Sequence, residues 1–131
     1  MLAMEFSYIA LGSLCLAFTF GVLRRKFGVV HVHGPSMYPH LNAGDRVIIA
    51  RRPSNYVRGD VVVITRPDSP GQLIKRIAAV AGDRFPGGLE AVPPNHVFVL
   101  GDNLPSSMDS RHFGFVPMDR VVGRMIRRLT I

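Results

Sequence analysis

The stretch LIKRIAAV, residues 73–80, sets the fold class of this chain because it is the longest of several β-type runs. A short apolar run bounded by Pro70-Gly71 and Gly82 is typical of a buried β-strand. Runs of the same kind occupy residues 29–33, 46–50, 60–65, 96–100 and 121–126. Glycine and proline separate the runs, so few spans remain for a second helix. The sequence therefore predicts a mainly β, small and compact domain.

The N-terminal part of the chain is apolar over a length that matches a membrane. Residues 6–23 carry no charge, and Glu5 and Arg24-Arg25-Lys26 bound them. At about 1.5 Å per residue, a helix over this stretch spans roughly 27 Å, close to the thickness of a hydrocarbon core. A cleaved signal peptide fits less well, because its basic residues precede the apolar part. We expect a transmembrane anchor with its basic flank in residues 1–26 and a β-rich domain in residues 27–131.

The formal net charge is +7, and every basic residue lies after residue 23. The arginines are scattered among strand-like segments with little aromatic interleaving, which argues against nucleic acid as a partner. A surface that meets membrane lipid with anionic headgroups explains the same charge. The single cysteine, Cys15, lies in the apolar stretch, so no intramolecular disulfide can form.

One serine and one lysine are candidate catalytic residues. Ser36 lies in a turn between Pro35 and Pro39, and Lys75 lies inside the apolar run. Burial disfavours the ammonium form, and lowering the pKa of a lysine to the 7–8 of a useful base costs roughly 4 kcal/mol. Of the 16 basic residues only Lys26 and Lys75 are lysines, and arginine stays protonated. The alternative is a structural turn serine and an exposed lysine.

A third segment, GDNLPSSMDSR at residues 101–111, completes a set of four motifs. Ahead of it, in order, the chain has Ser36-Met37-Tyr38-Pro39, Gly59-Asp60-Val61-Val62 and Lys75-Arg76. With these motifs behind one apolar segment, the chain resembles the type I signal peptidases from Val29 to about Gly123. The short spacing before the third segment resembles the compact bacterial members and the mitochondrial inner membrane processing peptidases. The resemblance implies a small β-barrel-like catalytic domain.

The resemblance also implies roles for single residues. Ser36 matches the family's nucleophile. Its backbone N–H matches the hydrogen-bond donor of the oxyanion hole. Lys75 matches the general base, and Ser107 the serine whose hydroxyl orients the lysine amine. Met37 matches a residue packed beside the dyad, and Asp109 and Arg111 match a structural ion pair near the site.

The chain departs from the family pattern at three places. Gly34 stands where some members carry a serine that contributes to the oxyanion hole, so the Ser36 N–H would carry more of that duty. His40 replaces the usual threonine, and Leu104-Pro105-Ser106 replaces a more polar stretch.

The histidines are rival candidates. His31 and His33 alternate along one strand and face the same side, so with His96 or His112 they could bind zinc. No cluster of His, Cys and Asp has a recognisable ligand spacing, so we expect neither a metal nor a cofactor.

These observations predict a membrane-bound serine endopeptidase that cleaves N-terminal signal peptides from exported proteins. Its substrates would be preproteins with small residues before the cleavage site, and a partner subunit is not specified. We expect a single-pass protein of the cell membrane with the catalytic domain on the outer face. The positive-inside tendency of Arg24-Arg25-Lys26 opposes this orientation.

Three alternatives remain. One is a processing peptidase subunit of the mitochondrial inner membrane. Another is a self-cleaving Ser/Lys regulator of the SOS-repressor type, which would have a DNA-binding helix-turn-helix where this chain has an apolar anchor. The last is an inactive binding module, against which the intact Ser36, Lys75 and Ser107 argue.

Overall fold

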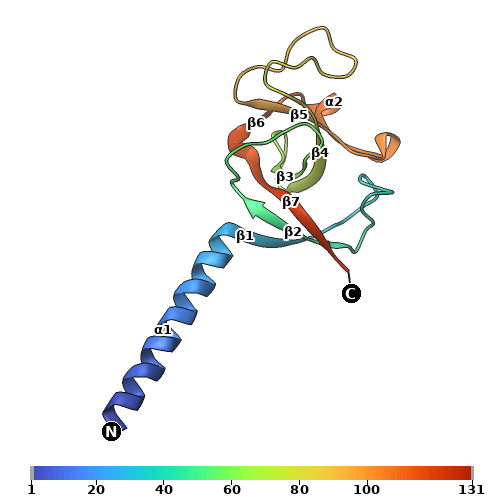
Figure 1. Cartoon of the computed structure of the whole chain (residues 1–131). Helices are drawn as coiled ribbons and strands as arrows, with labels where there is room; N and C mark the ends of the chain where they lie inside the picture. The colour runs from blue at the N-terminus through green and yellow to red at the C-terminus, as the bar shows by residue number, and fades with distance from the viewer. Residues whose placement is uncertain (1, 131) are drawn as a thin grey trace.

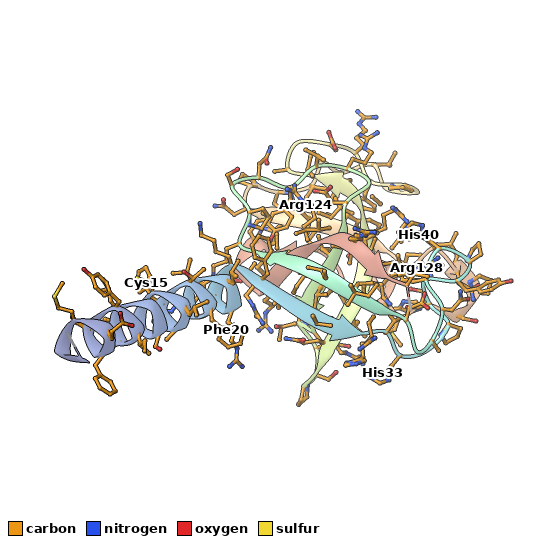
Figure 2. All side chains as sticks on the ribbon, turned by 60° about the horizontal axis from the view of Figure 1, so that its bottom comes forward. Cys15, Phe20, His33, His40, Arg124 and Arg128 are labelled. Carbon is orange, nitrogen blue, oxygen red and sulfur yellow. The ribbon has the colours of Figure 1, made fainter. Side chains whose placement is uncertain are left out.

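A long apolar helix, α1 (Leu2–Lys26), projects as a stalk from a β-sheet domain in the computed structural model, which describes residues 2–130 (Figure 1). Figure 2 shows Cys15 and Phe20 on this helix, outside the β domain. By length and composition, Met4–Lys26 is sufficient to cross a membrane. The hydroxyls of Ser13 and Thr19 donate to carbonyls one turn earlier, at 2.9 and 2.8 Å, so these polar groups are satisfied inside the helix.

Seven strands form one sheet in the order β1-β2-β7-β3-β4-β5-β6, and every neighbouring pair is antiparallel. The register shifts within the β2–β7, β3–β7 and β4–β5 pairs, and such bulges bend and twist strands. The sheet curls accordingly into a half-barrel (Figure 1). The strands are β1 (Phe27–His31), β2 (Arg46–Arg51), β3 (Val61–Thr65), β4 (Gln72–Val80), β5 (His96–Leu100), β6 (Val116–Pro117) and β7 (Val121–Leu129).

The predicted mainly β fold with one N-terminal apolar helix is confirmed. Strand β1 begins at Phe27, directly after α1, rather than at residue 29 as expected, because Phe27 already pairs with Ala50 of β2. The sequence did not predict β6, the single-turn helix α2 (Ser110–Phe113) or the 3₁₀ turns η1 (Leu104–Ser106) and η2 (Met118–Arg120). These elements are short, so periodicity gives them no signal.

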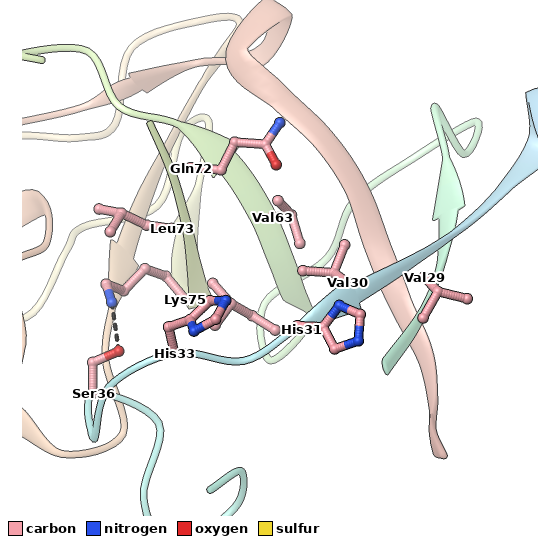
Figure 3. Close-up of a pocket in the computed structure, with 10 residues that line it drawn as sticks. Val29, Val30, His31, His33, Ser36, Val63, Gln72, Leu73 and Lys75 are labelled. Carbon is pink, nitrogen blue, oxygen red and sulfur yellow. Dashed lines mark hydrogen bonds between the residues drawn. The ribbon is translucent and has the colours of Figure 1, made fainter. Parts of the chain in front are cut away.

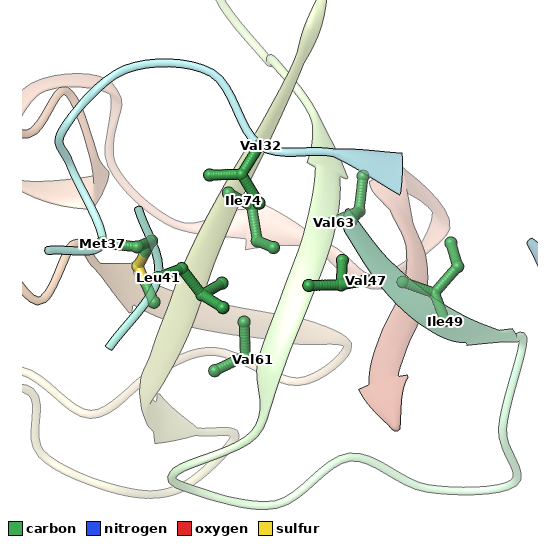
Figure 4. Close-up of a cluster of buried hydrophobic side chains, with 8 residues drawn as sticks. All are labelled: Val32, Met37, Leu41, Val47, Ile49, Val61, Val63 and Ile74. Carbon is green, nitrogen blue, oxygen red and sulfur yellow. The ribbon is translucent and has the colours of Figure 1, made fainter. Parts of the chain in front are cut away.

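The part of the core that holds the site in place lies under β1, β2, β3 and β4 (Figure 4). Three of its members, Val32, Met37 and Leu41, come from the segment between β1 and β2 and are 1%, 0% and 1% exposed. This loop is therefore anchored in the core at its middle rather than only at its ends. The whole cluster consists of Val32, Met37, Leu41, Val47, Ile49, Val61, Val63 and Ile74.

A second apolar cluster lies between β3, β5 and β7 around Val62, Ile64 and Val99, all fully buried. A third joins the loop after β4 to β5 through stacked Phe85 and Phe98, whose ring centroids lie 4.5 Å apart, with Phe115 edge-on. These clusters fix β4 from both faces, so a side chain in the middle of β4 has little freedom to reach solvent.

Candidate active site

Ser36 and Lys75 meet at the bottom of a cavity (Figure 3). The Lys75 Nζ donates to Ser36 Oγ at 2.7 Å. Lys75 is only 2% exposed, while Ser36 is half-buried at the cavity wall. The alternative of an exposed strand lysine is therefore wrong. A half-buried serine hydroxyl thus lies against an amine that water barely reaches.

The burial of Lys75 changes its acid–base behaviour. Desolvation lowers the pKa of Lys75 from 10.5 to about 8; the carboxylate of Asp109 raises it, and the guanidinium of Arg66 lowers it further. About a tenth of the lysine side chains are therefore neutral at pH 7. A neutral amine has a lone pair that can accept the Ser36 proton across the same short contact. The arrangement is thus suited to general-base chemistry near neutral pH.

Two hydrogen bonds from Asn103 hold the backbone of the Ser36 loop. The Asn103 backbone N–H donates to the Ser36 carbonyl at 2.9 Å, and its side-chain Nδ2 donates to the Pro35 carbonyl at 3.1 Å. Gly34 has a φ of +75°, a left-handed conformation that glycine adopts without strain. Together with the buried Met37, these contacts point the Ser36 hydroxyl toward Lys75.

Gly101 allows the Ser36 loop to approach β5 closely. A Cβ at this position would collide with the Ser107 side chain and would lie 2.7 Å from the Ser36 carbonyl oxygen. The sequence predicted no role for Gly101 and Asn103 beyond their place in the third motif, and it did not predict that both residues contact the Ser36 loop. The signal available was their place in the third motif, ahead of Ser107.

Arg76 connects the lysine strand to the same segment. Its guanidinium donates to both carboxylate oxygens of Asp102 at 2.8 and 2.7 Å and to the Gly59 carbonyl at 2.8 Å. Bidentate pairs of this kind fix geometry as well as charge. Arg76 thus ties together three of the four sequence motifs, and Asn103 ties in the fourth.

Asp109 is a second buried charge near the dyad, with 0% exposure. Its carboxylate accepts from Arg111 Nε at 2.9 Å, from the Arg111 backbone at 3.2 Å and from the Gly101 backbone at 3.0 Å. Burial alone would raise the pKa of Asp109, but these donors outweigh it and hold the pKa at about 2. Asp109 also caps helix α2, so the ion pair with Arg111 orders the third motif.

Ser107 lies next to the dyad and is 7% exposed. Its hydroxyl makes no hydrogen bond to Lys75, whose Nζ bonds to Ser36 instead, and it helps to lower the pKa of the neighbouring Asp109 carboxylate. The expected role of Ser107 in orienting the lysine therefore stays a prediction.

The cavity above the dyad has a volume of about 380 Å³. One wall comes from β1 and the chain just after it, including His31 and His33, and the other from residues 72–75 of β4 (Figure 3). Strand β1 is an edge strand, with a neighbour on one side only. An extended peptide can therefore pair along β1 and pass over Ser36.

The other histidines lie apart from His31 and His33. His96 Nδ1 contacts the Pro94 carbonyl at 2.7 Å, and His112 Nδ1 accepts from the Asp109 backbone at 3.3 Å. Within the described part of the chain, no group of three or more His, Cys, Asp or Glu side chains could hold a metal ion. The zinc alternative thus has no set of ligands among these residues.

Comparison with known proteins gives a family match over most of the chain. The profile of the family described as signal peptidase, peptidase S26 matches residues 4–87 and 85–130. The chain is 40% identical over 121 residues to the mitochondrial ATP-independent inner membrane protease subunit 1a of Arabidopsis thaliana, a match that covers 81% of this chain and 72% of the relative.

Two further relatives share the name of mitochondrial inner membrane protease subunit 1. The protein of Schizosaccharomyces pombe is 35% identical over 125 residues, which cover 86% of this chain and 80% of the relative. The protein of Mus musculus is 33% identical over 114 residues, which cover 78% of this chain and 69% of the relative. The chain therefore belongs to the signal peptidase family, peptidase S26, and so to a family of proteases.

Proposed function

We propose that the protein is a membrane-anchored serine endopeptidase that cuts N-terminal leader segments from precursor proteins, as a processing peptidase of the mitochondrial inner membrane type. The observation that carries the proposal is the 2.7 Å contact between buried Lys75 Nζ and accessible Ser36 Oγ. The names of the relatives favour this alternative over export from a cell membrane. Both interpretations use the same chemistry and differ in the membrane and the precursor.

The proposed mechanism is acyl transfer through Ser36. Neutral Lys75 takes the hydroxyl proton as Ser36 Oγ attacks the scissile carbonyl, and the tetrahedral intermediate forms. The lysine then gives this proton to the leaving amine, and the peptide bond breaks. Water, deprotonated by Lys75, hydrolyses the acyl-enzyme and restores Ser36.

The negative oxygen of the tetrahedral intermediate needs a hydrogen-bond donor. Gly34 has no side chain to offer, so the backbone N–H of Ser36 is the donor that we assign. The Ser36 loop is held by Asn103 and Met37, so this donor is positioned before the substrate arrives. Such preorganisation gives the donor more effect than a mobile one would have.

The anchor and the catalytic domain have separate tasks in this proposal. Helix α1 confines enzyme and precursor to the same thin layer and raises their effective concentration. It contributes no group to the cavity that contains Ser36. We place the β domain on the outer side of its membrane, although the basic residues after α1 oppose that orientation by the positive-inside tendency.

The test uses the purified full chain in detergent with a precursor that has a small residue before its cleavage site. We expect Ser36→Ala and Lys75→Ala to abolish cleavage, and their combination to be no slower than either alone, because the two residues act as a unit. Ser54→Ala, in an exposed loop, is the matched control and should cleave normally. Cleavage that survives Ser36→Ala in a folded protein would refute the proposal.

A further inference from the structure

Five basic side chains gather where α1 meets the β domain. Arg24, Arg25 and Lys26 end the helix, and Arg51 and Arg52 follow at the end of β2. The antiparallel pairing of β1 with β2 brings the two groups together, because Phe27 lies opposite Ala50. We call these five residues the basic junction. Among residues 2–130, none of the five takes part in an ion pair.

Two hollows open at the basic junction, and both are lined by Arg51. One, of about 570 Å³, has Arg24 and Arg51 beside apolar Phe20, Leu23 and Phe27. The other, of about 460 Å³, has Arg25, Arg51 and Arg52 with a single carboxylate, Asp119. The first hollow therefore combines guanidinium groups with an apolar wall, and the second adds positive charge.

Because Gly28 has no side chain, the Arg51 side chain can pack against β1 at this position. A Cβ on Gly28 would lie 2.7 Å from Arg51 Nη2 and 3.1 Å from its Cζ. The guanidinium thus packs closely against β1 at Gly28 and lines both hollows, and a side chain in place of Gly28 would require it to move. Arg51 is positioned without any carboxylate partner.

The position of this cluster along the molecule indicates its ligand. If α1 crosses a bilayer, its last turn ends at the level of the lipid headgroups. Guanidinium groups bind phosphate oxygens in a bidentate manner, and Phe20 and Leu23 offer an apolar surface to an acyl chain. A zwitterionic headgroup would bring its ammonium into a region with five cations and one carboxylate, which disfavours it.

We propose that the basic junction is a binding site for an anionic glycerophospholipid, with the phosphate on Arg51 and Arg24 and an acyl chain along the apolar wall. The site is separate from the cavity of Ser36 and does not depend on the catalytic assignment. In this site the basic residues at the end of α1 bind lipid headgroups on the same side of the membrane as the β domain. Binding would fix the angle between the anchor and the β domain.

The experiment measures lipid retention by native mass spectrometry of the full chain released from neutral detergent micelles. Dioleoylphosphatidylglycerol, dioleoylphosphatidylcholine and inorganic phosphate are titrated separately. We expect the chain to retain phosphatidylglycerol and not phosphatidylcholine. We expect inorganic phosphate not to displace it, because phosphate lacks the acyl chain. Equal retention of both lipids, or displacement by phosphate, would overturn the proposal.

Two variants locate the site. The double variant R51Q/R52Q should weaken phosphatidylglycerol retention by about 30-fold, the effect of two basic residues at a lipid surface. The matched control R58Q/R84Q removes the same charge from residues that line neither hollow. Gly28→Val keeps the charge but displaces Arg51, and should weaken retention as well. Unchanged retention in folded R51Q/R52Q, or an equal loss in the control, would overturn the proposal.

Discussion

Lys75 and Asp109 are both buried charges near the same serine, yet the pKa of Lys75 shifts in the direction that burial gives, whereas the pKa of Asp109 shifts against it. Lys75 has a hydroxyl as its hydrogen-bond partner, and burial lowers its pKa to about 8. Asp109 has a guanidinium and backbone N–H donors, and these hold its pKa at about 2 despite burial. The comparison teaches that the partners decide whether a buried group serves as a base or as a fixed charge.

The largest effect should come from replacing the base by a group that cannot lose its proton. Lys75→Arg keeps the positive charge, but a guanidinium stays protonated at any working pH. We expect kcat/KM for a peptide substrate to fall by about 10⁴-fold, as for the loss of a catalytic base. Lys75→Arg with near-normal activity and a normal circular dichroism spectrum would show that another group is the base.

The second prediction removes Arg111, the cationic partner of Asp109. Arg111→Met should leave the Asp109 carboxylate buried without its cation and lower the free energy of unfolding. Thermal unfolding at pH 7 measures this loss, with Arg58→Met, at an exposed surface pair, as the control. A loss no greater than that of Arg58→Met would mean that the backbone donors alone satisfy Asp109.

The contribution of Asp109 to the stability of the folded protein depends on pH in a defined way. Its folded pKa lies below the usual value of 3.8, so its stabilising contribution is present above about pH 4 and is lost as the pH falls toward 2. In Arg111→Met this acid-dependent loss should become smaller, since the pKa of Asp109 moves up toward its unfolded value.

A smaller effect should follow from moving the nucleophile loop without touching the dyad. Gly101→Ala places a methyl group against Ser107 and close to the Ser36 carbonyl, so the loop must shift. A displacement of about 1 Å at a reacting group costs roughly 100-fold in rate. We expect kcat to fall more than KM rises. A change confined to KM would place the effect in substrate binding.

Much of the fold and part of the site could be predicted from the sequence. The apolar neighbours of Lys75 predicted its burial, and the glycine and proline residues between runs predicted a sheet of short strands. The contacts of Asn103 and Gly101 with the Ser36 loop were not predicted, because they join segments far apart in the chain and the available signal was only the place of both residues in the third motif. The placing of the Ser107 hydroxyl away from Lys75 depends on side-chain geometry that no periodicity encodes.

The most direct test of the account is the pH dependence of kcat/KM for a soluble peptide, measured with the full chain in detergent. Only neutral Lys75 can accept the Ser36 proton, so activity should rise about tenfold per pH unit below the pKa and level off above about pH 8. His33→Ala, which removes a histidine from the cavity wall, should leave this profile unchanged. A plateau reached by about pH 6.5, or a rise that continues beyond pH 10, would contradict the account.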